Sequence, residues 1–142
     1  MAKSCRFSVA VHVCTAMAFN EGRPATSEWL AHSVNTNPVV IRRLLLSLAK
    51  AGLVRSLRGA AGGSVLARDV EAISLRDIYR AVEDVEGPAL HHRPPNAGCP
   101  VGAHILPVLS DVIGRAEEAL ERELAAVTLS DVVEQVRLRA AA

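Results

Sequence analysis

The sequence predicts a mainly α-helical fold, a winged helix-turn-helix with a small two-stranded wing and a long C-terminal dimerisation helix. Three observations predict it: two short helix patterns in close succession, a glycine-tipped pair of strand patterns directly after them, and a long amphipathic helix pattern near the C-terminus. The 142 residues are 50% hydrophobic but include only one Trp, one Tyr and two Phe. That composition is typical of a single core of packed helices.

The first predicted helix spans residues 4–20, with Ser4 as its N-cap. Its main apolar face is predicted to consist of Phe7, Val11, Cys14 and Ala18. Other apolar residues of this helix point away from that face. We therefore expect the helix to be buried on more than one side, against its own domain and against something else, such as a second subunit.

Two helices separated by a short break form the predicted helix-turn-helix. The first covers residues 26–34 with Thr26 as its N-cap, and the second starts after its own N-cap, Asn37. Pro38 lies in the first turn of the second helix, where a missing N–H is harmless, and Gly52 ends that helix. The buried stripe of the second helix is predicted to be Ile41, Leu44, Leu45 and Leu48.

A wing is predicted directly after the second helix. Residues 53–57 and 64–67 have weak strand patterns, and the glycine-rich residues 59–63 between them form a flexible tip. Two capping boxes, which begin at Ser74 and Thr128, predict the N-termini of two later helices.

The chain is predicted to divide into a DNA-binding winged helix-turn-helix domain at residues 1–86, a sensor loop or linker at 87–101, and a dimerisation helix with a C-terminal helix at 102–142. The linker holds four Pro, two Gly and two His. The long helix is expected from about residue 102 to about residue 127, and its apolar stripe needs a partner chain. Pro107 is unfavourable in a helix interior, so the helix either begins just before it or kinks there.

Basic residues are concentrated in the first half of the chain. Residues 1–69 carry nine Lys/Arg and three Asp/Glu, a net charge of +6, whereas residues 70–142 carry seven and twelve, a net charge of −5. A basic half is suited to a polyanion, and in a helix-turn-helix the second helix meets base edges while its flanks hold phosphates. Double-stranded DNA is therefore the predicted partner. The candidate DNA-binding residues are Lys3, Arg6, Ser27, Val39, Val40, Arg42, Arg43, Arg55, Arg58 and Gly59.

Each type of candidate residue has a specific chemical role. Arg42 and Arg43 carry guanidinium groups that can pair with the O6/N7 edge of guanine, and the valines before them can touch a thymine methyl. Arg58, beside the wing tip, can reach a phosphate or the minor groove. The alternative for any single arginine is a solvated surface side chain with no DNA contact.

Other classes of protein are disfavoured. No run of 18 apolar residues predicts a membrane span, and the N-terminus lacks a signal-peptide pattern, so we expect a soluble cytoplasmic protein with no membrane partner. The glycine-rich residues 59–63 lack the endings of a phosphate-binding loop or a dinucleotide site. No nucleophile–base or paired-carboxylate pattern is present, so no enzyme is predicted.

The order of these motifs resembles one known family. The segments that carry the resemblance are residues 26–31 (TSEWLA), 37–45 (NPVVIRRLL), 51–54 (AGLV), 59–67 (GAAGGSVLA), 73–83 (ISLRDIYRAVE) and 99–102 (CPVG). Together they are similar to the Rrf2 family of bacterial winged-helix transcription regulators. The resemblance implies a homodimer that grips an operator with two winged domains, swaps its long helices, and usually represses transcription.

The segment before the long helix departs from the cluster-binding members of that family, which place three cysteines there, because this chain has only Cys99. No iron–sulfur cluster or other cofactor is therefore expected. Cys99 is a candidate thiol sensor instead, since a position just before a helix start can lower a thiol pKa. The alternative is a packing position without a sensing role.

The other candidate ligands and thiols give weaker patterns. Three histidines could form a metal site with Cys99, but no compact ligand spacing is present and no metal is predicted. These histidines are His91, His92 and His104. Cys5 and Cys14 lie roughly 13 Å apart along one predicted helix and cannot pair with each other. Cys14 is predicted to be a small buried hydrophobe.

These observations predict a sequence-specific DNA-binding transcription regulator, a homodimeric repressor that responds to redox state through a thiol. Two alternatives remain open: a metal- or small-molecule-responsive regulator of the same fold, and a winged-helix module for protein contacts. A protein-contact module does not require arginines concentrated on one face. A steep loss of affinity with salt would mark DNA binding.

Overall fold

The computed structural model describes residues 4–84 and 87–142. The elements in chain order are α1 (Arg6–Phe19), α2 (Ser27–Val34), α3 (Pro38–Lys50), β1 (Val54–Leu57), β2 (Gly63–Leu66), the short 3₁₀ helix η1 (Val70–Ala72), α4 (Leu75–Val82), α5 (Pro100–Ala125) and α6 (Leu129–Ala140). The predicted fold class is confirmed: the described chain is mainly helical, with a two-stranded wing and a long helix near its C-terminus. Among the described residues, no helix is both long enough and apolar enough to cross a membrane.

The chain forms two compact units. One contains the described residues up to Glu83 together with Leu124–Ala142, and the other contains the described residues of Asp84–Glu123. The sequence predicts that α6 belongs with the long helix at residues 102–142, whereas the contacts place α6 in the first unit. The difference arises because α6 packs on α1 and η1, which lie far from it in the sequence.

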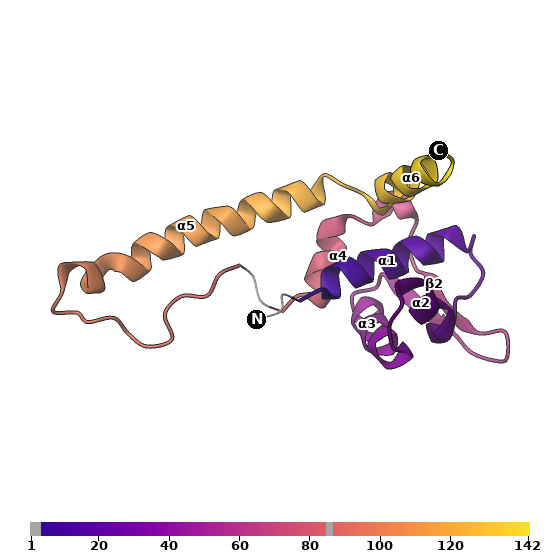
Figure 1. Cartoon of the computed structure of the whole chain (residues 1–142), viewed down its shortest axis with the longest axis horizontal. Helices are drawn as coiled ribbons and strands as arrows, with labels where there is room; N and C mark the ends of the chain where they lie inside the picture. The colour runs from indigo at the N-terminus through magenta and orange to yellow at the C-terminus, as the bar shows by residue number, and fades with distance from the viewer. Residues whose placement is uncertain (1–3, 85–86) are drawn as a thin grey trace. The chain divides into compact units, whose positions relative to one another are not determined.

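Helix α1 is the central element of the first unit (Figure 1). It contacts α2, α3, α4, α6 and β2, so it is packed on more than one side, as expected. The apolar side chains that α1 buries are Ala10, Val13, Cys14 and Met17. The predicted face was therefore wrong in part, because Phe7, Val11 and Ala18 are only partly buried. When a helix is apolar on several sides, its own sequence does not determine which side is buried most deeply. The elements that pack against it determine this.

The start of α1 is capped differently from the prediction. Cys5, not Ser4, is the N-cap residue, and its side chain makes no capping hydrogen bond. The Ser4 hydroxyl accepts a hydrogen bond from the Arg6 amide at 3.3 Å. The Glu83 carboxylate, from beyond the end of α4, accepts one from the Phe7 amide at 3.3 Å. A carboxylate at this position is favourable because a helix N-terminus carries positive partial charge.

Helices α2 and α3 begin and end as their local sequence predicts. The Thr26 hydroxyl accepts a hydrogen bond from the Trp29 amide at 3.1 Å, and the Asn37 side chain accepts one from the Val39 amide at 2.8 Å. Gly52 has a φ of 77°, in the left-handed region that favours glycine at a helix C-terminus. The predicted stripe of α3 is confirmed, because Ile41, Leu44, Leu45 and Leu48 are all buried.

The wing is a β1–β2 hairpin joined to the start of the helix-turn-helix. The strands are antiparallel, with Val54 opposite Leu66. Ala25 and Ser64 exchange two backbone hydrogen bonds of 2.9 and 2.8 Å. A Cβ atom at Gly63 would lie 2.6 Å from the Ala25 carbonyl oxygen, so this close approach requires glycine. The wing is therefore fixed to the residue that precedes the N-cap of α2.

Helices α4 and α6 start side by side. Both predicted capping boxes are present, Ser74 with Asp77 and Thr128 with Asp131. Their first residues also pair through the backbone: the Leu75 amide donates to the Val127 carbonyl and the Leu129 amide to the Ile73 carbonyl, at 2.9 and 2.8 Å. This pairing joins the segments before α4 and α6 within the first unit.

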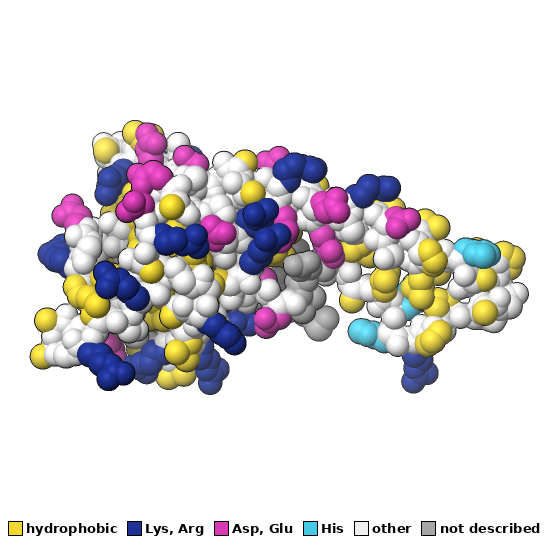
Figure 2. Space-filling view, turned by 180° about the vertical axis from the view of Figure 1, so that it is seen from behind, with side chains coloured by type: hydrophobic (Ala, Val, Ile, Leu, Met, Phe, Trp, Pro, Cys, Tyr) yellow, Lys and Arg dark blue, Asp and Glu magenta, His cyan; other side chains and the backbone are white. Residues whose placement is uncertain are grey.

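Helix α5 dominates the second unit. It begins at Pro100 and continues through Pro107, so the helix does not begin just before Pro107. None of its residues is buried within the single chain. Val101, Val108 and Val112 are 66%, 57% and 47% exposed, and Figure 2 shows hydrophobic side chains on the surface of this unit.

Candidate nucleic-acid interface

The start of α3 presents an apolar and basic face to solvent. Val39 and Val40 are 45% and 41% exposed, and Arg42 and Arg43 are exposed as well, whereas Ile41 between them is fully buried. The helical period explains this alternation, because Ile41 belongs to the stripe that packs on the core. The structure therefore leaves all four predicted base-reading side chains accessible.

A hollow of about 440 Å³ opens beside this face, between the helix-turn-helix and the wing. Ser27 and Arg42 line it from α2 and α3, and Ser56, Leu57 and Ser64 line it from the wing. The pairing of Ala25 with Ser64 is what brings these segments together. A concave surface with hydroxyl and guanidinium donors is suited to phosphate oxygens of a DNA backbone.

The wing supplies the other predicted contacts. Arg55 lies within β1, opposite Val65, and Arg58 follows the last residue of β1; both side chains are exposed. Gly59 has a φ of 104°, in the left-handed region, so the turn into the tip requires glycine there. In Figure 2, Lys and Arg side chains follow the lower edge of the first unit, where Figure 1 places α3 and the wing.

Two predicted phosphate contacts are not part of this arrangement. Arg6 is exposed at the first residue of α1 but does not line the hollow. Lys3 lies outside the described residues. Both remain predictions.

The structure adds one residue, Glu28, that no sequence pattern indicates. The Glu28 carboxylate on α2 accepts a hydrogen bond from the Arg42 guanidinium on α3, with an Oε1–Nη2 distance of 2.8 Å. The side chains stay 66% and 53% exposed, so this is a surface ion pair. No periodic signal could have found it, because the two residues lie on different helices.

Cys99 immediately precedes α5 and is exposed. Hydrogen bonds from the backbone amides of Gly102 and Val101 lower the pKa of the Cys99 thiol from its ordinary value. The preceding loop is folded tightly over the helix start, and a Cβ atom at Gly102 would collide with the Asn96 carbonyl. The predicted effect of the helix start on this thiol is present in the structure.

The other two cysteines differ from Cys99. Cys14 is fully buried, as predicted, and burial raises the pKa of its thiol to about 12. Cys5 is exposed beside the start of α1. Within residues 4–84 and 87–142, no three His, Cys, Asp or Glu side chains group closely enough to hold a metal ion.

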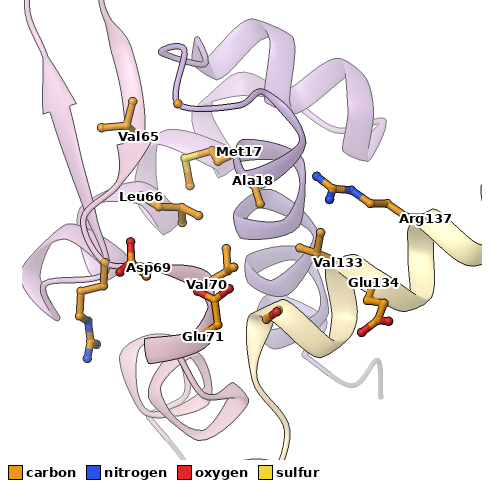
Figure 3. A pocket seen from close by; sticks show the side chains of 13 residues that line it. Met17, Ala18, Val65, Leu66, Asp69, Val70, Glu71, Val133, Glu134 and Arg137 are labelled. Atoms are coloured by element: carbon orange, nitrogen blue, oxygen red, sulfur yellow. The ribbon is translucent and has the colours of Figure 1, made fainter.

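Two further hollows lie in the first unit. One, of about 620 Å³, is lined by apolar side chains that include Met17, Leu66 and Val133, with Asp69 and Arg137 among its charged residues (Figure 3). The other is a groove lined by residues of α1, α2 and α6, mostly apolar, in which Phe19, Trp29 and Val136 are 39%, 45% and 42% exposed.

A winged helix-turn-helix with a basic recognition helix and arginines on its wing is the architecture of a DNA-binding transcription regulator. The model of the family described as "Rrf2: Iron-dependent Transcriptional regulator" matches residues 3–135. The chain belongs to the Rrf2 family, so it is a DNA-binding transcription regulator and not an enzyme.

Individual relatives agree with this assignment. YwnA of Bacillus subtilis, named as an HTH-type transcriptional regulator, is 41% identical over 128 residues, which cover 90% of this chain and 94% of YwnA. The transcriptional regulator CymR of the same organism is 35% identical over 78 residues, 55% of this chain and 56% of CymR.

Solved structures share the fold over nearly the whole chain. The structure of Bacillus subtilis CymR, described as the global cysteine regulator, has a TM-score of 0.71 and 26% identity and covers 95% of this chain and 98% of its own. T. potens IscR has a TM-score of 0.71 and 26% identity, with coverages of 96% and 88%.

Proposed function

We propose that the chain is a cytoplasmic, homodimeric repressor that reads its operator with the start of α3. The observation that supports this most directly is the accessible face of α3, where two valines precede Arg42 and Arg43. Valine can contact thymine methyl groups and arginine can pair with guanine in the major groove. A repressor of this kind acts by occupying the operator.

The flanking contacts of the proposed interface go to the DNA backbone. Arg55, Arg58 and Gly59 on the wing, with Ser27 at the start of α2, are the proposed phosphate or minor-groove contacts. Arg6 is proposed to add a phosphate contact from α1, together with Lys3.

The proposed homodimer is supported by the apolar surface of α5. Val101, Val108 and Val112 are exposed in the single chain, which is unfavourable in water by roughly 25 cal/mol per Å² of apolar area. A second copy would cover this surface. The apolar groove formed by α1, α2 and α6 offers the partner chain a second surface to cover.

The experiment that tests DNA recognition starts from a random duplex library, because the operator is unknown. The purified protein selects duplexes, and anisotropy titrations then compare an enriched duplex with a shuffled duplex of the same composition. We expect preferential binding of the enriched duplex and a steep loss of affinity between about 50 and 200 mM salt. Failure to enrich any sequence, or an affinity indifferent to salt, would contradict a sequence-specific regulator.

We also propose that Cys99 couples DNA binding to redox state. The support is its exposure and the two backbone amides that stabilise its thiolate. In the presence of glutathione, diamide is expected to join the Cys99 thiol to the glutathione thiol in a mixed disulfide, while diamide itself is reduced to the hydrazine. This change should weaken operator binding of the unsubstituted protein and leave the Cys99→Ser variant unaffected, while Cys5→Ser serves as the control. Binding of the unsubstituted protein that ignores diamide would contradict the proposal.

A second candidate function is a regulator whose operator binding is controlled by a small molecule, and the hollow in Figure 3 favours it. Its volume of about 620 Å³ lies in the range of ligand sites, and it is lined by both β2 of the wing and α6. Val133→Trp would fill this hollow. Loss of effector response with retained operator binding in that variant would support a ligand site there.

A further inference from the structure

Glu28 and Arg42 connect the two helices of the helix-turn-helix through their side chains. Glu28 is the second residue of α2 and Arg42 the fifth residue of α3. Their contact at 2.8 Å lies at the surface, beside the hollow that Arg42 lines. A DNA group that approaches the Arg42 guanidinium therefore meets the Glu28 carboxylate beside it.

The position of Glu28 favours its ionised form. It lies in the first turn of α2, where the helix carries positive partial charge. A hydrogen bond from its own backbone amide, followed by the hydrogen bond from Arg42, lowers the pKa of the Glu28 carboxyl. The carboxylate is thus a charged acceptor at neutral pH, held to the start of a helix that Thr26 caps.

The effect on Arg42 follows from the geometry of guanidinium. The group is planar and carries five N–H donors, of which Glu28 engages one on Nη2. This bond restricts a long flexible side chain, so less rotamer freedom remains to be lost on binding. The other donors stay available for the O6/N7 edge of guanine.

Arg43 provides an internal comparison. It follows Arg42 on the exposed face, but within the described part of the chain its guanidinium has no hydrogen bond or ion pair. Any influence of Glu28 on the reading of DNA should therefore reach Arg42 and leave Arg43 unchanged.

We propose that Glu28 is a positioning residue for operator recognition: it orients the Arg42 guanidinium so that this side chain discriminates guanine at one base pair of each half-site. The proposal rests on the proposed reading of DNA by α3. It extends that function because it gives Glu28 a role in sequence specificity, although the phosphate backbone of DNA would repel this acidic residue.

Simple charge repulsion is the competing explanation, and it predicts a different result. If Glu28 only repels phosphate, its removal should tighten binding to every duplex equally. If Glu28 orients Arg42, its removal should weaken discrimination at the base pair that Arg42 reads. The two effects separate when cognate and base-substituted duplexes are titrated in parallel.

The test uses the whole 142-residue chain and the duplex enriched by the unsubstituted protein. Arg42→Ala first identifies the base pair that Arg42 reads, because discrimination is lost there. Arg43→Ala identifies the base pair that Arg43 reads in the same way. Glu28→Ala is then expected to reduce discrimination at the Arg42 base pair about two- to fivefold, the range of a surface ion pair, and to leave the Arg43 base pair unchanged. In the Arg42→Ala background, Glu28→Ala should have no further effect on discrimination.

Control variants separate the orientation of Arg42 by Glu28 from a general effect of negative charge and from a loss of folding. Glu118→Ala removes the same charge at an exposed position of α5 that does not line the hollow, and should leave discrimination unchanged. Glu28→Gln keeps an acceptor oxygen and should retain part of the discrimination. Thermal unfolding checks that α2 stays folded in each variant.

The outcomes are distinguishable. Equal tightening on all duplexes with Glu28→Ala, or unchanged discrimination, would overturn the positioning role while leaving DNA recognition by α3 intact. If the unsubstituted protein enriches no sequence, the proposed function itself fails.

Discussion

Arg42 and Arg43 are adjacent in the sequence but have different surroundings. The Arg42 guanidinium is held by Glu28, whereas that of Arg43 has no hydrogen bond or ion pair within residues 4–84 and 87–142. Their positions on the exposed face of α3 follow from the helical period. Their partners do not, because Glu28 belongs to another helix.

Arg43→Ala is expected to weaken operator binding by about 1–3 kcal/mol and to relax the preference at one base pair, because its guanidinium is proposed to pair with a base. Anisotropy titration at fixed salt measures both effects. Arg93→Ala, in the exposed segment before α5, is the matched control and should change affinity little. A uniform loss on cognate and shuffled duplexes would show that Arg43 contacts phosphate rather than a base.

The three cysteines are expected to differ in reactivity. The pKa of the Cys99 thiol is lowered by backbone amides, so its thiolate fraction rises at a lower pH than that of an unfolded cysteine. Iodoacetamide should therefore modify Cys99 faster than Cys5 at neutral pH, with a rate profile shifted to lower pH. Cys14, whose pKa burial raises to about 12, should not react in the folded protein.

Peptide mass spectrometry after timed alkylation gives the three rates separately. In denaturant all three cysteines should react alike. Coinciding pH profiles for Cys99 in the folded and unfolded protein would refute the effect of the helix start.

At the scale of elements, the wing is joined to the helix-turn-helix through the backbone. The backbone bonds between Ala25 and Ser64 tie the hairpin to the residue before the N-cap of α2. Gly63 permits this approach because it has no side chain. A Cβ atom at this position would lie only 2.6 Å from the Ala25 carbonyl oxygen. The position of Arg58 relative to α3 therefore depends on a single glycine.

Gly63→Ala is expected to lower the free energy of unfolding by about 1–3 kcal/mol, since the new methyl group meets backbone that cannot give way without breaking the Ala25–Ser64 pair. Chemical denaturation measures this loss. Ser56→Ala, an exposed position in the same hairpin, should stay within about 0.5 kcal/mol of the unsubstituted protein. Equal stability of the two variants would show that the wing is not fixed in this way.

At the scale of the whole molecule, the two units differ in how they bury apolar surface. The first unit has a continuous core around α1, whereas α5 buries none of its own residues in the single chain. A long helix with exposed valines is unfavourable in water, and the proposed association with a second copy would relieve this. The C-terminal helix α6 belongs to the first unit.

Val108→Glu combined with Val112→Glu is expected to convert a dimer into a monomer at micromolar concentration, because the two charges would be desolvated in the interface. Sedimentation velocity measures the mass. Ser110→Glu, on the other side of the same helix, is the control and should remain dimeric. A monomeric unsubstituted protein would refute the homodimer.

The sequence by itself determined the helix-turn-helix and its boundaries, because caps and turn residues act within a few positions. Thr26, Asn37 and Gly52 mark helix ends that the structure reproduces, and the capping boxes at Ser74 and Thr128 are both present. The sequence also determined which face of α3 is accessible, because its predicted apolar stripe is the side that packs on the core.

Only the tertiary structure decided which side of α1 is innermost, that α6 joins the first unit, and that Glu28 holds Arg42. The physical reason is the same in each case. These features are contacts between segments far apart in the chain, and several apolar or charged partners were equally compatible with the local pattern. The choice among them depended on how the elements pack around α1.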